Sequence, residues 1–268
     1  MTSVDTKASP AAGKPGKPGK PRELAIVIGA SGAMGQVIAG QLADAGYQVL
    51  AVARDLRALE RLAAGHANVR PVAADIANDV AIDTLRAAID GPVRAVIHGP
   101  GVPTAGGVLT APTSALTEAV NIKVGGMVRA VRAADHHLME GSRLIAIGGH
   151  YGFEPSAYAA TAGVANAALA NLVRQLSWAY GPRQITAHLI APGPADTERL
   201  RRVATERAAR DGTTLDDVLE TMRGESAIGA FTTPEQIAWA VQMLLSPNAD
   251  ALAGSTLFMD AGRRRGIP

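Results

Sequence analysis

The chain has 268 residues, 47% of them hydrophobic, which is enough for one large domain with a substantial core. It contains no cysteine, so disulfides and thiolate chemistry are excluded, and a cytoplasmic location is the expectation. No apolar run approaches the roughly 20 residues that cross a bilayer, so we expect no membrane partner.

The sequence pI near 9.1 comes from the two ends of the chain. Residues 1–22 carry a net charge of +4, and the three arginines of the tail at 263–268 add +3. Because the whole chain is +2, the part between carries −5. A folded body of that sign gives no support for nucleic-acid binding. We interpret the ends as solubilising, with a disordered leader at 1–22 that repeats Gly-Lys-Pro.

From Glu23 onward, short apolar runs alternate with longer amphipathic segments. The short runs are apolar almost throughout, as strands covered on both faces are. The predicted strands are Leu24–Ile28, Gln48–Ala53, Val69–Ala73, Ala95–His98, Arg143–Gly148, Thr186–Ile190 and Thr256–Met259. The predicted helices are Met34–Ala45, Leu56–Ala64, Ala77–Ile89, Thr113–Met139, Ala157–Tyr180, Thr197–Arg210, Leu215–Arg223 and Pro234–Leu245.

Repeated alternation of strands and helices predicts a doubly wound parallel sheet, which is a Rossmann-type α/β fold in a single domain over 23–262. The helix over 157–180 has almost no polar face. One side can lie on the sheet, and the other is expected to meet a partner subunit in a homodimer or homotetramer.

The stretch "IVIGASGAMG" places three glycines at three-residue intervals between the first strand and the first helix. Gly29 allows a tight turn, Gly32 lets the backbone approach a pyrophosphate, and Gly35 lets the helix pack closely on the strand. The helix N-terminus then faces the phosphates with free N–H groups. Ser31 adds a hydroxyl donor, and Met34 completes the predicted cofactor-binding turn.

The second strand ends in "LAVARDL", where the first polar residue is Arg54. An acid at this position would bind the ribose 2′-hydroxyl, whereas a guanidinium suits a 2′-phosphate by charge and by its fork of donors. Arg57 can assist one helical turn later. The sequence therefore favours NADP(H) over NAD(H). The alternative is that Arg54 is simply solvated, with Asp55 as a helix N-cap.

Further motifs give the chain a resemblance to the short-chain dehydrogenase/reductase family from Leu24 to Gly262. The motifs are "VAADIAN", "AVNIKVGG", "IAPGPADTE" and the long stretch that ends in "LFMDAG". The resemblance implies that Asp75 and Ile76 read the adenine and that Asn121 is the active-site asparagine. It also implies that Thr197 binds the nicotinamide amide, in a pocket shaped by Pro192 and Gly193.

Several positions depart from the family pattern. The Asn-Asn-Ala-Gly stretch reads His98-Gly99-Pro100-Gly101, with Gly99 expected beside the cofactor. The family's catalytic serine would fall at Gly148 or Gly149. The Tyr-x-x-x-Lys motif aligns with "YAATA", which keeps Tyr158 and replaces the lysine with Ala162. We therefore predict an atypical member that lacks the serine and lysine of the catalytic set.

Ketone reduction needs a proton for the oxygen as well as a hydride. Three local side chains are candidates to supply or relay the proton: Tyr158, His150 at the end of a central strand, and the adjacent Tyr151. Each has an alternative role in packing or on the surface. Asn121 is expected to keep a structural or water-holding role. A substrate with its own acidic hydroxyl beside the carbonyl would also serve.

Residues 195–231 form a long insertion that the resemblance makes a lid over the substrate. Its apolar residues suit a pocket lining, although a helix pair packed only on its own domain is an equal alternative: Ala195, Leu200, Val203, Leu219 and Met222. We predict an NADPH-dependent ketoreductase for a bulky hydrophobic, polycyclic or polyketide ketone, as in antibiotic biosynthesis, with no metal. The alternatives are a dehydratase or cyclase of the same fold, and an inactive NADP(H)-binding sensor or scaffold.

Overall fold

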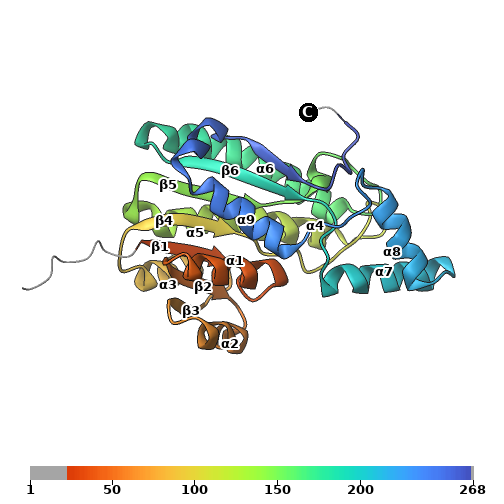
Figure 1. Ribbon diagram of the computed structural model, residues 1–268, viewed down its shortest axis with the longest axis horizontal. Helices are drawn as coiled ribbons and strands as arrows, with labels where there is room; N and C mark the ends of the chain where they lie inside the picture. Colours follow the sequence, from red (N-terminus) through yellow and green to blue (C-terminus); the bar gives the residue numbers. More distant parts are fainter. Residues whose placement is uncertain (1–22, 267–268) are drawn as a thin grey trace, which may run out of the picture.

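A computed structural model describes residues 23–266, so the predicted leader and the last two residues lie outside the described part of the chain. The described residues form a seven-stranded parallel sheet of order β3-β2-β1-β4-β5-β6-β7 (Figure 1). The predicted doubly wound α/β fold is confirmed. The strands are β1 (Leu24–Ile28), β2 (Gln48–Ala53), β3 (Val69–Ala73), β4 (Val93–His98), β5 (Leu138–Ile147), β6 (Thr186–Pro192) and β7 (Thr256–Met259).

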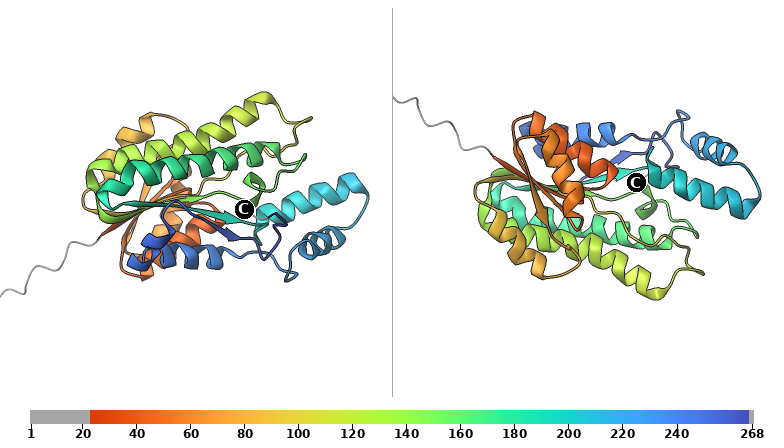
Figure 2. Two further views of the ribbon diagram at one scale, coloured as in Figure 1. Left: turned by 90° about the horizontal axis from the view of Figure 1, so that it is seen from above. Right: turned by 90° about the horizontal axis from the view of Figure 1, so that it is seen from below.

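Helices cover both faces of the sheet, as Figure 2 shows in its two views. One face is covered by α1 (Ala33–Asp44), α2 (Leu56–Gly65) and α9 (Pro234–Leu244). The other face is covered by α3 (Val80–Ala88), α5 (Gly126–Ala134) and α6 (Ala160–Tyr180). Apolar side chains from each layer fill a separate core against the sheet, which explains why the strands are apolar on both faces. None of the described helices is long and apolar enough to span a membrane.

The helix predicted over 113–139 is too long. It comprises α4 (Thr113–Val120), a π-helical turn η1 (Asn121–Gly125), α5 and a 3₁₀ turn η2 (Asp135–His137). The helical segment ends at His137 because Leu138 pairs with Val93 and is the first residue of β5. This strand therefore begins five residues before its predicted start. The π turn η1 is a local widening of a helix, a feature that occurs frequently at functional sites.

The helices α7 (Glu198–Asp211) and α8 (Leu215–Gly224) extend beyond the carboxyl edge of the sheet (Figure 1). They pack on each other through a small core of their own that includes Leu219. Hydrogen bonds between the 194–196 segment and Thr232 join the two ends of this insertion. We call the pair, with its flanking residues 195–231, the lid.

Short 3₁₀ turns η3 (His150–Gly152), η4 (Gly181–Arg183) and η5 (Pro247–Leu252) connect the remaining elements. The described tail residues contact the body of the protein and do not stand free in solvent. Arg263 donates to the Met222 carbonyl and pairs with Glu225, and the Arg264 guanidinium lies 3.4 Å from the centroid of the Phe258 ring. The tail therefore fastens the end of α8 to the last strand.

Candidate active site

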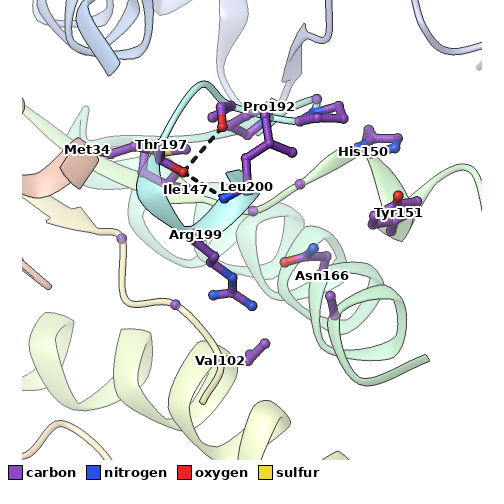
Figure 3. Close-up of a pocket in the computed structure, with 18 of the residues that line it drawn as sticks. Met34, Val102, Ile147, His150, Tyr151, Asn166, Pro192, Thr197, Arg199 and Leu200 are labelled. Carbon is purple, nitrogen blue, oxygen red and sulfur yellow. Dashed lines mark hydrogen bonds between the residues drawn. The ribbon is translucent and has the colours of Figure 1, made fainter. Parts of the chain in front are cut away.

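A cavity of about 290 Å³ opens at the carboxyl ends of the central strands, beneath the lid (Figure 3). In open α/β sheets this edge is where ligands bind. Its walls come from the loops after β4, β5 and β6, from η1 and α6 on one side, and from α7 and α8 on the other.

The glycine turn beside the cavity is as tight as its sequence predicts. Gly29 has φ +86°, and an added Cβ there would lie 2.9 Å from the Pro100 nitrogen. A Cβ on Gly35 would lie 2.2 Å from the Gly29 carbonyl oxygen. Gly32 caps α1, and neither a capping side chain nor an acid occupies the first turn of that helix. The helix N-terminus is therefore open to an anionic group.

The predicted adenosine-binding residues lie along the same sheet edge. Arg54 follows β2 and is exposed, and no described residue accepts a hydrogen bond from its guanidinium. Asp55 caps α2 by accepting from the Ala58 nitrogen, as predicted. Asp75 is exposed, its carboxylate accepts from the Ala77 nitrogen, and Ile76 is buried. The structure thus leaves Arg54 free to meet a phosphate.

Five of the predicted cofactor-binding residues come together in the cavity wall. They are Met34 of the glycine turn, Gly99 after β4, and the predicted nicotinamide-binding residues Pro192, Gly193 and Thr197. A Cβ on Gly193 would lie 2.9 Å from the Asp260 Cα, so a glycine is required for this close approach. The Thr197 hydroxyl accepts from the Leu200 nitrogen and donates to the Ala195 carbonyl, so it caps α7 at the cavity edge (Figure 3).

Two of the predicted proton donors, His150 and Tyr158, differ in burial and in whether they line the cavity. His150 is 4% exposed and lines the cavity, and burial, with the charge of Arg263, lowers its pKa to about 4. It is therefore a neutral imidazole near pH 7. Tyr158 is 57% exposed and is not part of the cavity wall.

Tyr151 connects these two residues. It lines the cavity, its ring stacks 4.0 Å from that of His150, and its hydroxyl lies 2.8 Å from the Tyr158 hydroxyl. Burial and the hydrogen bond to Tyr158 raise the pKa of Tyr151. Burial also raises the pKa of Tyr158, but hydrogen bonds from Tyr151 and Ser156 and the charge of Arg263 outweigh it and lower the pKa overall.

Asn121 does not line the cavity. Its amide donates to the Ala77 carbonyl at 2.9 Å, and its oxygen accepts from Arg129 at 2.9 Å. The carboxamide thus links η1 to the loop before α3 through its nitrogen and to Arg129 of α5 through its oxygen. His98 is fully buried, with Nε2 3.0 Å from the Ile122 carbonyl, and burial lowers its pKa to about 3. The Asn121 carboxamide is engaged within the protein, and its catalytic role stays a prediction.

Three polar residues of the cavity wall were not predicted from the sequence: Lys123, Asn166 and Arg199. Asn166 lies four residues after Ala162 on the same face of α6, and both line the cavity. A buried polar residue on that otherwise apolar face was the available signal. Lys123 follows Asn121 by two residues, where the π turn directs it inward, and no periodic pattern predicts such a turn. Arg199 lies in the first turn of α7, after Thr197.

Of the predicted lid residues, Ala195, Leu200, Val203 and Met222 line the cavity, whereas Leu219 packs between the lid helices. The arrangement thus combines an anion-ready turn at one end, apolar lid side chains at the other, and polar groups between them. Such a site can hold an apolar molecule against a dinucleotide.

Residues 29–264 match the family model described as Enoyl-(Acyl carrier protein) reductase. The chain is 29% identical to the short-chain reductase protein NovJ of Streptomyces niveus over 95% of this chain and 99% of that protein. It is 28% identical to the inactive 2-(S)-hydroxypropyl-CoM dehydrogenase 2 of Xanthobacter autotrophicus, over 81% and 95% of the two chains.

The solved structure of BdcA in complex with NADPH has 25% identity and a TM-score of 0.76, covering 90% of this chain and 93% of that one. The sheet order, the glycine turn and these matches agree. The chain belongs to the short-chain dehydrogenase/reductase family.

Proposed function

We propose that the protein is an NADP(H)-dependent reductase of a ketone on a bulky hydrophobic molecule, with atypical proton delivery. One observation carries the proposal: a single cavity joins Met34 of the glycine turn to the apolar lid residues Leu200, Val203 and Met222. A dinucleotide seated at the turn and a substrate held under the lid would therefore share one space, as hydride transfer requires.

The residues present fit such a cofactor. The open N-terminus of α1 suits the diphosphate, and the unpaired Arg54 suits a 2′-phosphate by its charge and planar donors. Gly99, Pro192 and Thr197 leave space for a flat ring at the cavity edge. When bound, the reduced nicotinamide supplies the hydride. The chain's own tasks are to orient the two molecules, exclude water and bring a proton to the oxygen.

The proton path that the geometry favours is the pair Tyr151–Tyr158. Tyr151 is the one tyrosine among the described residues that line the cavity, and its hydroxyl is hydrogen-bonded to the exposed Tyr158. A proton given up on the cavity side can be replaced from solvent through Tyr158. His150 does not compete as an acid, because its lowered pKa leaves it neutral.

The experiment is loss of NADPH absorbance at pH 7 with aromatic hydroxyketones as substrates. We expect turnover with NADPH and much less with NADH. The control is Gly35→Ala, which closes the glycine turn and should abolish turnover. If no ketone is reduced although NADPH binds, the reductase assignment fails.

A second candidate, an NADP(H)-binding protein without turnover, is favoured by one observation. The cavity wall has glycines, Gly148 and Gly149, where the family resemblance implies the catalytic serine. It has Ala162 where the resemblance implies the catalytic lysine. Calorimetry separates the candidates: binding of NADPH without absorbance loss supports the sensor or scaffold. Conversion of a ligand without NADPH consumption would instead support a dehydratase or cyclase.

A further inference from the structure

The cavity contains a buried ammonium group that has no counterion among the described residues. Lys123 is 7% exposed, and its Nζ donates to the Ile147 carbonyl at 2.8 Å. That bond uses one of three N–H donors, and no described carboxylate forms an ion pair with this lysine. Buried charges in proteins are normally paired, because an unpaired one loses its hydration without compensation. Burial, followed by the charge of Arg199, lowers the pKa of Lys123 to about 8.

A second cation lies in the same cavity. Arg199 reaches from α7 toward the loop after β4, where its Nη1 would lie 2.9 Å from a Cβ on Gly101. The residue as a whole is exposed, but partial burial of its guanidinium, followed by the charge of Arg202, lowers its pKa. No described carboxylate pairs with it, and the cavity wall contains neither Asp nor Glu. Two like charges thus share a space in which residues 23–266 place no carboxylate to balance them.

An unsatisfied amide completes the set. Asn166 is 5% exposed, and its Oδ1 has no hydrogen-bond partner among the described residues. Figure 3 shows Asn166 and Arg199 pointing into the same part of the cavity, from α6 and α7. A buried acceptor without a donor costs free energy that a ligand hydroxyl or amide can recover.

We propose that Lys123 and Arg199 bind an anionic oxygen group, a carboxylate or an ionised hydroxyl, on the apolar substrate. The assignment deepens the proposed function, because it rests on the cavity being the substrate site. Leu200, Val203 and Met222 provide the apolar wall for the body of the ligand. Asn166 accepts from a neighbouring hydroxyl. The substrate class is therefore an aromatic or polycyclic hydroxyketone or keto acid that carries a negative charge near pH 7.

The cofactor's diphosphate is the other possible source of an anionic oxygen. The open N-terminus of α1 already provides a separate site for that group, beside Gly29 and Gly35. The Lys123 ammonium group, which extends from η1, lies instead at the end of β5, where it donates to the Ile147 carbonyl. These positions favour the substrate as the source of the anionic oxygen. Titration of an anionic probe with and without the cofactor distinguishes the two sources.

The test uses the full chain and isothermal titration calorimetry with salicylate as the anionic probe and salicylamide as its neutral counterpart. Titrations are made with and without saturating NADP⁺. We expect salicylate to bind in both conditions and salicylamide to bind at least about tenfold more weakly, since charge-assisted hydrogen bonds are lost. Salicylate binding that disappears with NADP⁺ present would assign the cations to the cofactor and overturn the proposal.

The variants are Arg199→Gln and Lys123→Met, with Arg202→Gln as the matched control because Arg202 is on the same helix and does not line the cavity. Salicylate affinity should fall at least about tenfold in the first two variants and stay unchanged in the control. Because Arg199 is solvent-accessible, that variant should fold even if Lys123→Met does not. Equal affinity in Arg199→Gln and the wild type overturns the proposal.

These readouts separate this proposal from the proposed function. Calorimetry with salicylate requires no turnover, so a protein that binds the anion and never consumes NADPH would retain the anion site and lose the reductase assignment. Suppose instead that the protein reduces neutral ketones as readily as anionic ones and that Arg199→Gln has wild-type kinetics. The reductase assignment would then be retained, and the anion site would be lost.

Discussion

The Tyr151 hydroxyl lies 2.8 Å from the Tyr158 hydroxyl, so a tyrosine in the cavity wall is hydrogen-bonded to one that is 57% exposed. The rings meet edge to face, with their centroids 5.7 Å apart. Arg263 contributes positive charge to both groups from the C-terminal tail. The tail, the lid and the candidate proton path thus meet at one place.

We expect Tyr151→Phe to lower kcat at least about 100-fold, which is the lower end of what a general acid contributes. Tyr158→Phe should have a smaller effect, because Tyr151 keeps its own proton and loses only its hydrogen-bonded neighbour. Steady-state kinetics of both tyrosine variants measure these effects, and wild-type kcat in both would point to proton delivery by the substrate.

His150→Ala should leave the pH dependence of kcat unchanged, because a group with pKa about 4 does not titrate near pH 7. Steady-state kinetics of this variant from pH 6 to 9 test the prediction.

Arg54→Ala should weaken NADPH binding about tenfold or more and leave NADH binding nearly unchanged. The physical reason is the loss of charge-assisted hydrogen bonds to the 2′-phosphate, a group that NADH lacks. Calorimetry with both nucleotides measures the difference. Arg86→Ala is the control, because that arginine lies on α3 and pairs with Asp83. Equal losses for the two nucleotides would contradict a phosphate role.

The sheet could be predicted closely because buried parallel strands have a strong local signature. Four of the seven strands begin and end at the predicted residues, including Val69–Ala73 and Thr256–Met259. The predicted start of β5 was wrong because Leu138 and Met139 are apolar residues that also suit the end of a helix. Only pairing with Val93, which is distant in sequence, makes Leu138 part of a strand.

The site was predictable in part for a similar reason. The glycine turn and the Pro192–Thr197 loop are contiguous motifs, so their residues could be named in advance. Lys123 and Arg199 belong to different segments, and their proximity depends on the π turn of η1 and on how the lid folds over the sheet. The Tyr151–Tyr158 contact depends on the path of the short loop before α6.

Gly35→Ala should abolish dinucleotide binding and lower the free energy of unfolding by about 1–3 kcal/mol, the range for overpacking. The added Cβ would lie 2.2 Å from a backbone oxygen and 2.8 Å from the Ala30 Cα, neither of which is a flexible side chain. Gly65→Ala is the control, since a Cβ there meets nothing within 4 Å. Urea unfolding and calorimetry with NADPH measure the two effects; unchanged nucleotide affinity in Gly35→Ala would place the cofactor elsewhere.

Asn121→Ala should lower the free energy of unfolding by about 1–3 kcal/mol, because it leaves the Ala77 carbonyl without its side-chain donor and removes one of the acceptors of the Arg129 guanidinium. Asn121 lies outside the cavity wall, so we expect only a small change in kcat. Any change would arise indirectly, because a shift of η1 moves Lys123 in the cavity wall. Asn171→Ala on the exposed side of α6 is the control. A large loss of kcat at unchanged stability would give Asn121 a direct catalytic role.

The pH dependence of stability should report on Lys123. Its pKa is about 8 in the folded chain and near 10.5 when unfolded, so the unfolded chain binds more protons between these values. The free energy of unfolding contributed by this group therefore rises with pH from about 8 to 10.5, at up to about 1.4 kcal/mol per pH unit. Below pH 8 the buried ammonium destabilises the fold.

Lys123→Met keeps the length of the side chain and removes the charge, so it should be more stable than the wild type at pH 7 and lose that advantage by pH 10.5. The difference between the two urea-unfolding curves isolates this group, because the other titrating residues, including nearby His98, are shared. Saturating salicylate should raise the pKa of Lys123 by pairing with it and thus shrink the advantage of Lys123→Met at pH 7. A pH-independent difference would mean that the ammonium is well solvated or already paired, and the anion site would then lose its physical basis.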